Sequence, residues 1–468
     1  MLSVDENALK IVECLRRAHE DWCKEASPFE SIFLLFAHDF VIHFSGILLH
    51  REAKEGYSDG VKFPYITREY AKHPYRLVEF DDVRPALRRD LKGAVRQFGL
   101  SKVALGHAVP IDKKNEGITG KWMNLLGAQK PFVRAFLPKR EIQIQALQEL
   151  IHEVAREFDI PEVDAVWGNW NQHIDMHTTS KQPVISPYGV IVGTRNHLQN
   201  RKLAVNYLQQ RKEVVAVTHG EVANSVMDEP PFGYSERTLC SVLVDYGDYD
   251  KDGFYNVPWV MPRRRIYRNG VIANKVYEPS SDIRFPGSRA ASGLYIPTIH
   301  HGNTLYGPFH AFEDIKYREW QLKVCSLLEN VTFKVHPKSR SGPIVGVPLE
   351  NRSLEICIKD YDYLVFDYFA TGAMLGLVTD KPVIYCDIGL RKLHPDFLYD
   401  LKNRCEYVKI DLENLDKSYL ATKLSEALSS QKSFSNEGIK KYVFCKSDKF
   451  SWKEIFLRLN SGKSLSSG

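Results

Sequence analysis

The chain has 468 residues, 44% of them hydrophobic and 26% charged, with a formal net charge of +5 at pH 7. This length suits two domains of about 200 residues each, and the composition is that of a globular chain, which excludes a fibrous or wholly disordered protein. No window approaches the ~18 consecutive apolar residues of a membrane span. The basic clusters accompany no recognised nucleic-acid motif, so no nucleic-acid partner is expected.

The N-terminal segment is acidic and lacks the basic region of a secretory signal. The eight cysteines are scattered without a Cys-x-x-Cys pair, so we expect free thiols in a reducing compartment. Both features favour the cytoplasm. The basic clusters are most simply solvated helix faces; the alternative is attraction to an anionic membrane surface or a phosphorylated ligand.

Apolar periodicity predicts helices over 6–26 and 143–158. Two further apolar runs, 31–36 and 41–49, fit either strands or a buried helix, and 52–124 gives no clear assignment. A strand is expected over 163–167, followed by a polar loop in which two tryptophans either pack in the core or stack on a sugar ring.

The next stretch alternates between strands and helices. We expect strands at 184–192, 213–217 and 241–244 and a helix at 196–211. The strand at 213–217 leads directly into Thr218-His219-Gly220-Glu221, and an acidic loop follows with Asp228 and Glu229. Open α/β sheets bind ligands at the carboxyl ends of their strands, so polar groups here are candidates for a site.

Transfer to a hydroxyl needs a general base, or a carboxylate nucleophile if the reaction is a double displacement. His219 is our candidate base, with Asp228 as the carboxylate alternative. Glu221 and Glu229 are further candidates on the acceptor side of a cleft. The alternative is that His219 caps a helix and the acids are solvated loop residues.

A basic, Pro- and Gly-rich segment, 256–293, is interpreted as the crossover between two domains. After it we expect a strand at 293–297 with Thr298 in its loop, a helix at 312–328, and a strand ending at His336-Pro337-Lys338. A strand–helix–strand unit then covers 360–387. A strand at 407–410 and helices at 419–428 and 449–459 complete the pattern, and 461–468 is expected to be disordered.

Several polar residues fall just past these strand ends, in a layout typical of anion binding. A helix start with free N–H groups and the Thr371 hydroxyl can bind a phosphate, and Gly372 allows close approach. His336 can donate to a phosphate oxygen and stabilise a departing nucleotide, and Lys338 adds positive charge. The alternatives are an ordinary helix cap at Thr371 and a hydrogen-bonded strand-end histidine at His336.

The remaining histidines do not indicate a metal. His300, His301 and His310 lack the spacing of a ligand set and have no accompanying Cys or acid motif. We therefore expect no metal and no cofactor.

The segments Lys334-Val335-His336-Pro337-Lys338 and Phe366-Asp367-Tyr368-Phe369-Ala370-Thr371-Gly372 resemble the paired signatures of GT-B transferases with an HP motif. These enzymes act in bacterial surface polysaccharide synthesis and include capsule-type Kdo transferases, bacterial sialyltransferases and CDP-glycerol glycerophosphotransferases. Segments 218–220, 294–298 and 381–385 are similar to theirs in order and spacing. The chain departs from the pattern in having Ala370-Thr371 for the usual hydroxyl pair and Glu-Val-Ala-Asn after His-Gly.

The resemblance implies an α/β protein of the GT-B class, two Rossmann-like domains with the active site in the cleft between them. It implies residues 1–260 on the acceptor side, 261–445 on the nucleotide-donor side, and a helix at 446–460 that returns to the N-terminal domain. The implied donor-binding residues are His336, Lys338, Asp367, Thr371 and Gly372, with Thr298 elsewhere in the cleft.

The function expected from this resemblance is a metal-independent glycosyltransferase with a cytidine-activated donor, CMP-Kdo or a related CMP-ulosonic acid. Its acceptor would be a glycan or lipid-linked glycan at the inner face of the cytoplasmic membrane, and the last helix permits peripheral membrane contact. The catalytic residues would be His219, Asp228 and His336. The alternatives are a CDP-glycerol or CDP-ribitol polyol-phosphate transferase, a nucleotide-sugar epimerase of the same fold, and a non-catalytic scaffold.

Overall fold

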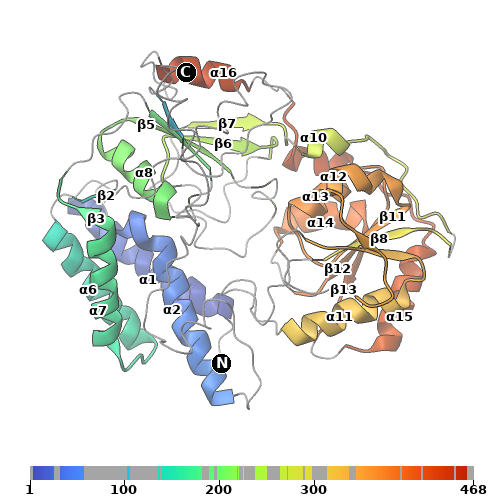
Figure 1. Ribbon diagram of the computed structural model, residues 1–468, viewed down its shortest axis with the longest axis horizontal. Helices are drawn as coiled ribbons and strands as arrows, with labels where there is room; N and C mark the ends of the chain where they lie inside the picture. The colour runs from blue at the N-terminus through green and yellow to red at the C-terminus, as the bar shows by residue number, and fades with distance from the viewer. Residues whose placement is uncertain are drawn as a thin grey trace.

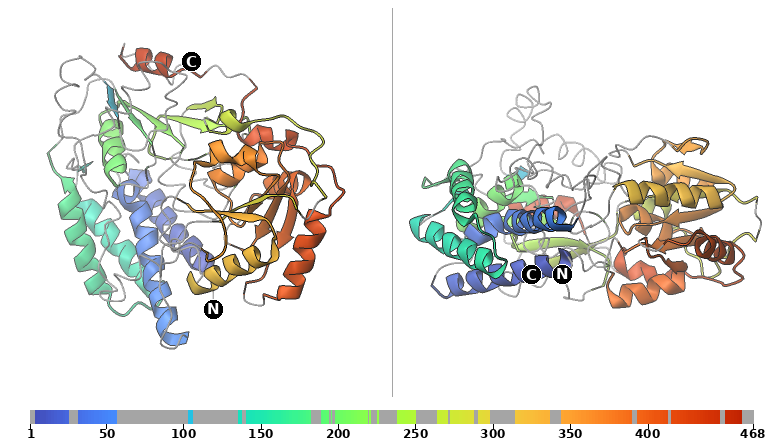
Figure 2. Two further views of the ribbon diagram at one scale, coloured as in Figure 1. Left: turned by 45° about the vertical axis from the view of Figure 1, so that its right-hand side comes forward. Right: turned by 90° about the horizontal axis from the view of Figure 1, so that it is seen from below.

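The structure is a computed structural model. It describes the following parts of the chain: 4–25, 32–56, 103–105, 135–137, 140–181, 189–193, 195, 198–218, 220, 225, 238–249, 264–270, 272–287, 290–297, 314–336, 344–389, 393–412, 415–446 and 450–460. Within them the chain is mixed α/β, with two larger parallel sheets that lie in separate halves of the molecule (Figure 1). The halves stay side by side in both further views (Figure 2).

Four long helices pack together beside the first sheet: α1 (Val4–Glu25), α2 (Ile32–Gly56), α6 (Arg140–Glu157) and α7 (Val163–His177). The two apolar runs at 31–36 and 41–49 belong to one continuous buried helix, α2. The expected strand at 163–167 is wrong, because this segment opens α7. Its buried residues Val166, Trp170 and Ile174 recur every four positions, which is a helical spacing.

A buried ion pair joins this helical group to the first sheet. The Arg201 guanidinium on α8 (Leu198–Gln209) donates to both carboxylate oxygens of Asp39 on α2, at 2.7 and 2.8 Å. Burial alone would raise the pKa of Asp39, but Arg201 and the nearby His173 hold that pKa below its ordinary value. The pair is inside the core, so it fixes α2 against α8.

The first sheet follows chain order, β1-β4-β5-β6-β7, and all of its neighbouring strands are parallel. The strands are β1 (Val103–Leu105), β4 (Gly189–Val192), β5 (Glu213–Val217), β6 (Val242–Tyr246) and β7 (Arg264–Arg268). One face packs on α8 and the helical group, and the other on α16 (Trp452–Asn460). Two short parallel strands, β2 (Ala135–Phe136) and β3 (Thr178–Thr179), pair separately.

The second sheet is also parallel and has the order β10-β9-β8-β11-β12-β13. Its strands are β8 (Gly293–Ile296), β9 (Val331–Lys334), β10 (Leu349–Glu350), β11 (Tyr363–Phe366), β12 (Val383–Asp387) and β13 (Glu406–Lys409). In chain order this is 3-2-1-4-5-6, the strand order of a doubly wound nucleotide-binding fold.

Both faces of the second sheet are buried, which is why its strands are near-continuous apolar runs. One face packs on α11 (Asp314–Leu327) and α15 (Lys417–Leu428). The other face packs on several shorter helices from before, between and after the strands: α10 (Ala273–Val276), α12 (Leu354–Cys357), η3 (Ile358–Asp360), α13 (Thr371–Leu377), α14 (Pro395–Arg404) and η4 (Glu437–Tyr442).

The change from one sheet to the other comes after residue 268, because β7 pairs with β6 of the first sheet, whereas the expected boundary lay at residue 260. The expected elements at 143–158, 196–211, 213–217, 241–244, 293–297, 312–328, 407–410, 419–428 and 449–459 are confirmed to within a few residues. The expected disordered tail, 461–468, lies outside the described residues. None of the described helices is both long and apolar enough to cross a membrane.

All eight cysteines of the chain fall in the described parts, and they are free thiols, six of them buried. This confirms the expectation from their spacing. Burial raises the pKa of several, including Cys325 and Cys405 to about 12, so these thiols are held protonated at neutral pH.

Candidate functional site

The structure describes four of the residues expected at the site: His336, Asp367, Thr371 and Gly372. The others lie outside the described residues: His219, Glu221, Asp228, Glu229, Thr298 and Lys338. The two residues on either side of His219, Thr218 and Gly220, are described. Thr218 continues β5 with its backbone N–H donating to the Val244 carbonyl at 3.0 Å, and Gly220 follows in a left-handed conformation with φ +76°.

The centre of the second sheet lies between β8 and β11. From β8 the chain moves to β9 on one side, and from β11 it moves to β12 on the other. At such a switch point the connections leave in opposite directions, and an open α/β sheet binds its ligand there, outside the carboxyl ends of the strands. β11 ends at Phe366, and α13 begins at Thr371 on this edge.

Thr371 occupies the first position of α13. The residue before it, Ala370, has extended backbone and makes no side-chain hydrogen bond that caps the helix, because alanine has no polar group. The first N–H groups of a helix have no partner within the helix. The Thr371 hydroxyl and these N–H groups therefore lie together at the switch point.

Gly372 is packed between the end of β8 and the start of α12. A Cβ placed on it would lie 3.5 Å from Leu354 and 4.0 Å from Ile296, both ordinary contacts. The α13 start is thus bounded by apolar side chains from two neighbouring elements.

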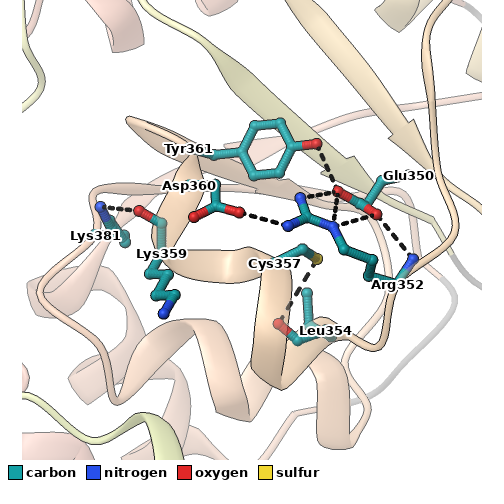
Figure 3. A network of polar contacts seen from close by, with 8 residues as sticks. All are labelled: Glu350, Arg352, Leu354, Cys357, Lys359, Asp360, Tyr361 and Lys381. Carbon is teal, nitrogen blue, oxygen red and sulfur yellow. Dashed lines mark hydrogen bonds and ion pairs between the residues drawn. The ribbon is translucent and has the colours of Figure 1, made fainter.

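A polar network holds the segment that carries Leu354 (Figure 3). The Arg352 guanidinium donates to both oxygens of Glu350, at 3.1 and 2.6 Å, and to Asp360 at 2.7 Å. The Tyr361 hydroxyl donates to Glu350 at 3.1 Å. The hydrogen bonds from Arg352 hold the pKa of Glu350 down at about 2. This network fixes the chain from β10 through η3, and with it one wall beside α13.

The resemblance implies that Asp367 binds the donor, and in the structure Asp367 is a buried residue with three hydrogen-bond donors around it. Its carboxylate is 1% exposed and accepts hydrogen bonds from Tyr295, Tyr317 at 3.0 Å and Trp320 at 2.9 Å. Burial, and then the Asp367 charge, raise the pKa of Tyr295 well above its ordinary value. Asp367 therefore joins β8, α11 and the end of β11, and it supports the turn that leads to Thr371.

His336 is half-buried and follows β9 by two residues. It lies at the same edge of the sheet as Thr371, because the strands are parallel. One strand, β8, separates β9 from β11, which places the two strand ends about 10 Å apart.

The two sheets meet at this edge. A Cβ built on Gly220 would lie only 2.8 Å from the Thr371 Oγ1, so the backbone after β5 touches the start of α13. Farther along, the His394 backbone N–H, just before α14, donates to the Ser225 carbonyl at 2.9 Å. The Tyr249 hydroxyl, past β6, donates to Asp396 at 2.6 Å.

We call this region the junction: Gly220, Ser225 and Tyr249 from the first half, Thr371 and His394 from the second. Burial, and then the neighbouring Asp396, raise the pKa of the Tyr249 hydroxyl, which keeps that hydroxyl protonated and able to donate. The carboxyl ends of β5 and β6 thus face the loops that follow β11 and β12.

The tryptophan segment, for which stacking on a sugar ring was the alternative to core packing, belongs to α7 in the helical group. Trp170 is fully buried in α7, and its indole N–H donates to the His43 Nδ1 at 2.8 Å. The packing interpretation therefore applies to it. Among the described residues no three His, Cys, Asp or Glu side chains are grouped so as to hold a metal ion, and His300, His301 and His310 lie outside them.

No protein-family model matches the chain, and no curated protein sequence matches it. Among solved structures, the chain is similar to one described as the crystal structure of the glycotransferase of kitacinnamycin. That match has 10% sequence identity and a TM-score of 0.30, and it covers 74% of this chain and 86% of the other. Similarity at this level establishes neither a shared fold nor a shared activity, so we draw nothing from it.

Proposed function

We propose that the protein is a glycosyltransferase of GT-B arrangement that binds a nucleotide-activated sugar at the junction. The observation that carries this proposal is the apposition of Gly220 and Thr371. It brings the carboxyl end of β5 against the switch point of a sheet with the 3-2-1-4-5-6 order, which favours a nucleotide ligand. A transferase needs a donor and an acceptor side by side. The carboxyl ends of strands from the two sheets face each other here, so one sheet can bind the donor and the other the acceptor.

In this proposal the donor phosphate lies at Thr371 and Gly372. The threonine hydroxyl and the adjacent N–H groups, including that of Gly372, donate to phosphate oxygens. His336 and Lys338 stabilise the negative charge that develops on the departing nucleotide. Asp367 acts through the turn that it supports and does not touch the donor.

The segment after β5 supplies the acceptor side. His219 takes the proton of the acceptor hydroxyl as that oxygen attacks the anomeric carbon, and the bond from that carbon to the nucleotide phosphate oxygen breaks. Asp228 is the alternative base or nucleophile, and Glu221, Glu229 and Thr298 are proposed to line the same space.

The donor class is proposed from the sequence signatures at His336 and Thr371. We propose a cytidine-activated sugar, CMP-Kdo or a related CMP-ulosonic acid, transferred without a metal to a glycan or lipid-linked acceptor. The reaction would take place in the cytoplasm, at the inner face of the membrane.

A donor panel tests this proposal. Purified protein is incubated with CMP-Kdo, CMP-sialic acid, CDP-glycerol, a UDP-sugar and a GDP-sugar, each with and without a mixture of lipid-linked glycan acceptors, and nucleotide release is measured. Release of CMP that depends on the acceptor supports the proposal. Transfer of a labelled polyol phosphate from CDP-glycerol would replace it with the phosphotransferase alternative, and conversion of a nucleotide sugar without an acceptor would replace it with an epimerase.

One variant connects the assay to the site. His336→Ala is expected to lower turnover about 100-fold, within the range for a group that assists proton transfer or charge stabilisation, while the protein stays folded. Normal turnover in this variant would remove His336 from the mechanism.

A further inference from the structure

Ser225 is a buried serine on the first-half side of the junction. Its side chain is 0% exposed, yet within the part of the chain that the structure describes its Oγ has no hydrogen-bond partner. A buried hydroxyl without a partner costs free energy, and native proteins rarely keep one without a reason.

Other buried hydroxyls of this chain find partners close in sequence. The Thr178 Oγ1 donates to the Ile174 carbonyl at 2.6 Å, and the Thr379 Oγ1 donates to the Gly376 carbonyl at 2.7 Å. Both side chains are 3% exposed. The Ser225 hydroxyl differs from these two hydroxyls in having no partner among the described residues.

The backbone of Ser225, by contrast, is tightly held. Its carbonyl accepts the His394 N–H at 2.9 Å, and the His394 Nδ1 accepts the Asp396 N–H at 2.9 Å, which caps α14. The His394 ring also packs edge-on against Tyr249, with ring centroids 5.8 Å apart. The protein thus fixes the position of this serine without using its hydroxyl.

Ser225 belongs to the same junction as the proposed donor site. Ser225 follows Gly220 by five residues, and the Gly220 backbone touches Thr371. Its partner His394 belongs to the loop after β12, and Thr371 belongs to the loop after β11, the adjacent parallel strand, so both lie past the carboxyl ends of neighbouring strands. A donor bound at the start of α13 would carry ribose, phosphate and sugar oxygens, each able to bond to a serine hydroxyl.

We propose that the Ser225 hydroxyl hydrogen-bonds an oxygen of the bound nucleotide-activated donor and so acts as a donor-binding residue. This inference rests on the proposed function. The second half holds most of the ligand, and Ser225 adds a contact from the first half. Donor binding would then depend on the two halves meeting at the junction.

The test compares wild type, Ser225→Ala and a matched control, Ser241→Ala. The Ser241 Oγ is engaged: it accepts the Val214 N–H at 3.0 Å and lies within hydrogen-bond distance of the Val214 carbonyl, at 3.2 Å. Melting temperature is measured alone and with CMP, CDP, UDP, GDP and ADP, and dissociation constants are measured for the nucleotides that bind and for CMP-Kdo.

Because the hydroxyl of Ser225 has no partner in the described chain, Ser225→Ala is expected to keep or raise the melting temperature without ligand. Its donor affinity should fall about tenfold, as for one lost hydrogen bond. Ser241→Ala should melt at a lower temperature and bind as wild type does. Weaker binding of CMP itself would place the contact on the nucleotide, and weaker binding of CMP-Kdo alone would place it on the transferred sugar.

Two results would overturn the inference, and they are distinguishable. If wild type binds nucleotides and Ser225→Ala binds every one equally well, Ser225 is not a donor contact, and the proposed function stands. If wild type binds none of the nucleotides and does not bind CMP-Kdo, the proposed function fails and the donor contact fails with it.

Discussion

Replacing Gly220 by alanine tests whether the two halves of the molecule meet as the structure shows. Gly220 has φ +76°, and a Cβ on it would lie 2.8 Å from the Thr371 Oγ1, whereas ordinary contacts begin at 3.4 Å. The left-handed backbone costs a non-glycine residue roughly 1–2 kcal/mol. Displacing the Thr371 hydroxyl adds about 1–3 kcal/mol, as for other overpacked contacts. We therefore expect Gly220→Ala to lower the free energy of unfolding by about 2–5 kcal/mol.

A second glycine separates the two contributions. Gly346 has φ +81°, and nothing lies within 4 Å of a Cβ placed on it, so Gly346→Ala has the backbone cost of roughly 1–2 kcal/mol alone. The double variant Gly220→Ala/Thr371→Ala removes the crowded hydroxyl. It should recover the part of the stability loss that crowding causes and keep the part that the left-handed backbone causes. The assay is urea unfolding of wild type, Gly220→Ala, Thr371→Ala, the double variant and Gly346→Ala. The first four form a double-mutant cycle between positions 220 and 371.

The reasoning would be refuted by equal losses for the two glycine variants together with a coupling energy below about 0.5 kcal/mol between positions 220 and 371. That result would mean that Gly220 and Thr371 do not touch in solution, and the junction would have to be abandoned.

Three further predictions concern Asp367, His43 and Arg352. Asp367→Ala leaves three buried donors without their acceptor and should cost about 3 kcal/mol or more in urea unfolding; a loss below 1 kcal/mol would contradict its role in the core. Burial holds the pKa of His43 at about 3, against an ordinary 6.5. As the pH falls below about 6.5, the unfolded chain therefore protonates this imidazole while the folded protein does not. The free energy of unfolding should fall as the pH drops from about 6.5 toward 3. His43→Gln, whose amide oxygen can still accept from Trp170, should flatten that fall, and an unchanged pH profile would argue against it. Arg352→Met should lower stability only slightly at pH 7, because Arg352 is half exposed and exposed ion pairs contribute little. Glu350 has a lowered pKa, about 2 when paired, so the difference from wild type should shrink as the pH falls from 4.5 toward 2; a constant difference would exclude the ion pair as its cause.

Five strands of the second sheet, β8, β9, β11, β12 and β13, were predictable from the sequence, whereas the two-residue strand β10 was not expected. Strands buried on both faces are short apolar runs, and the helices between them are long enough to span back over the sheet. The start of α13 was predictable for the same reason, since Thr371-Gly372 follows such a run directly. What the sequence could not show is the strand order, which depends on pairings between distant segments.

In two of the N-terminal helices, α2 and α7, the apolar pattern alone could not distinguish a helix from strands. α2 is apolar on almost every side, so it has no stripe to reveal its period, and a buried helix of that kind is hard to distinguish from strands. The segment at 163–167 is similarly short and apolar, and only the buried positions farther along, Trp170 and Ile174, reveal a helix.

The candidate site was only partly visible in the sequence. Asp367 carries a charge just past a strand, which is typical of a ligand-binding residue, but its three partners, Tyr295, Tyr317 and Trp320, come from elements that no local pattern connects to it. The opposite holds for Ser225, which no motif singles out. Only its burial and the contact of its carbonyl with His394 place it at the junction.

Thermal stabilisation by nucleotides tests the central proposal, donor binding at the junction, most directly. Wild type and Thr371→Ala are melted with CMP, CDP, UDP, GDP and ADP, because a ligand that binds the folded state at about 100 times its dissociation constant adds about 2.7 kcal/mol of stability. We expect CMP or CDP to raise the melting temperature of wild type and to raise that of Thr371→Ala much less. A shift with UDP or GDP would discard the cytidine donor, and equal shifts in both proteins would contradict a phosphate site at Thr371. No shift with any nucleotide would contradict donor binding altogether.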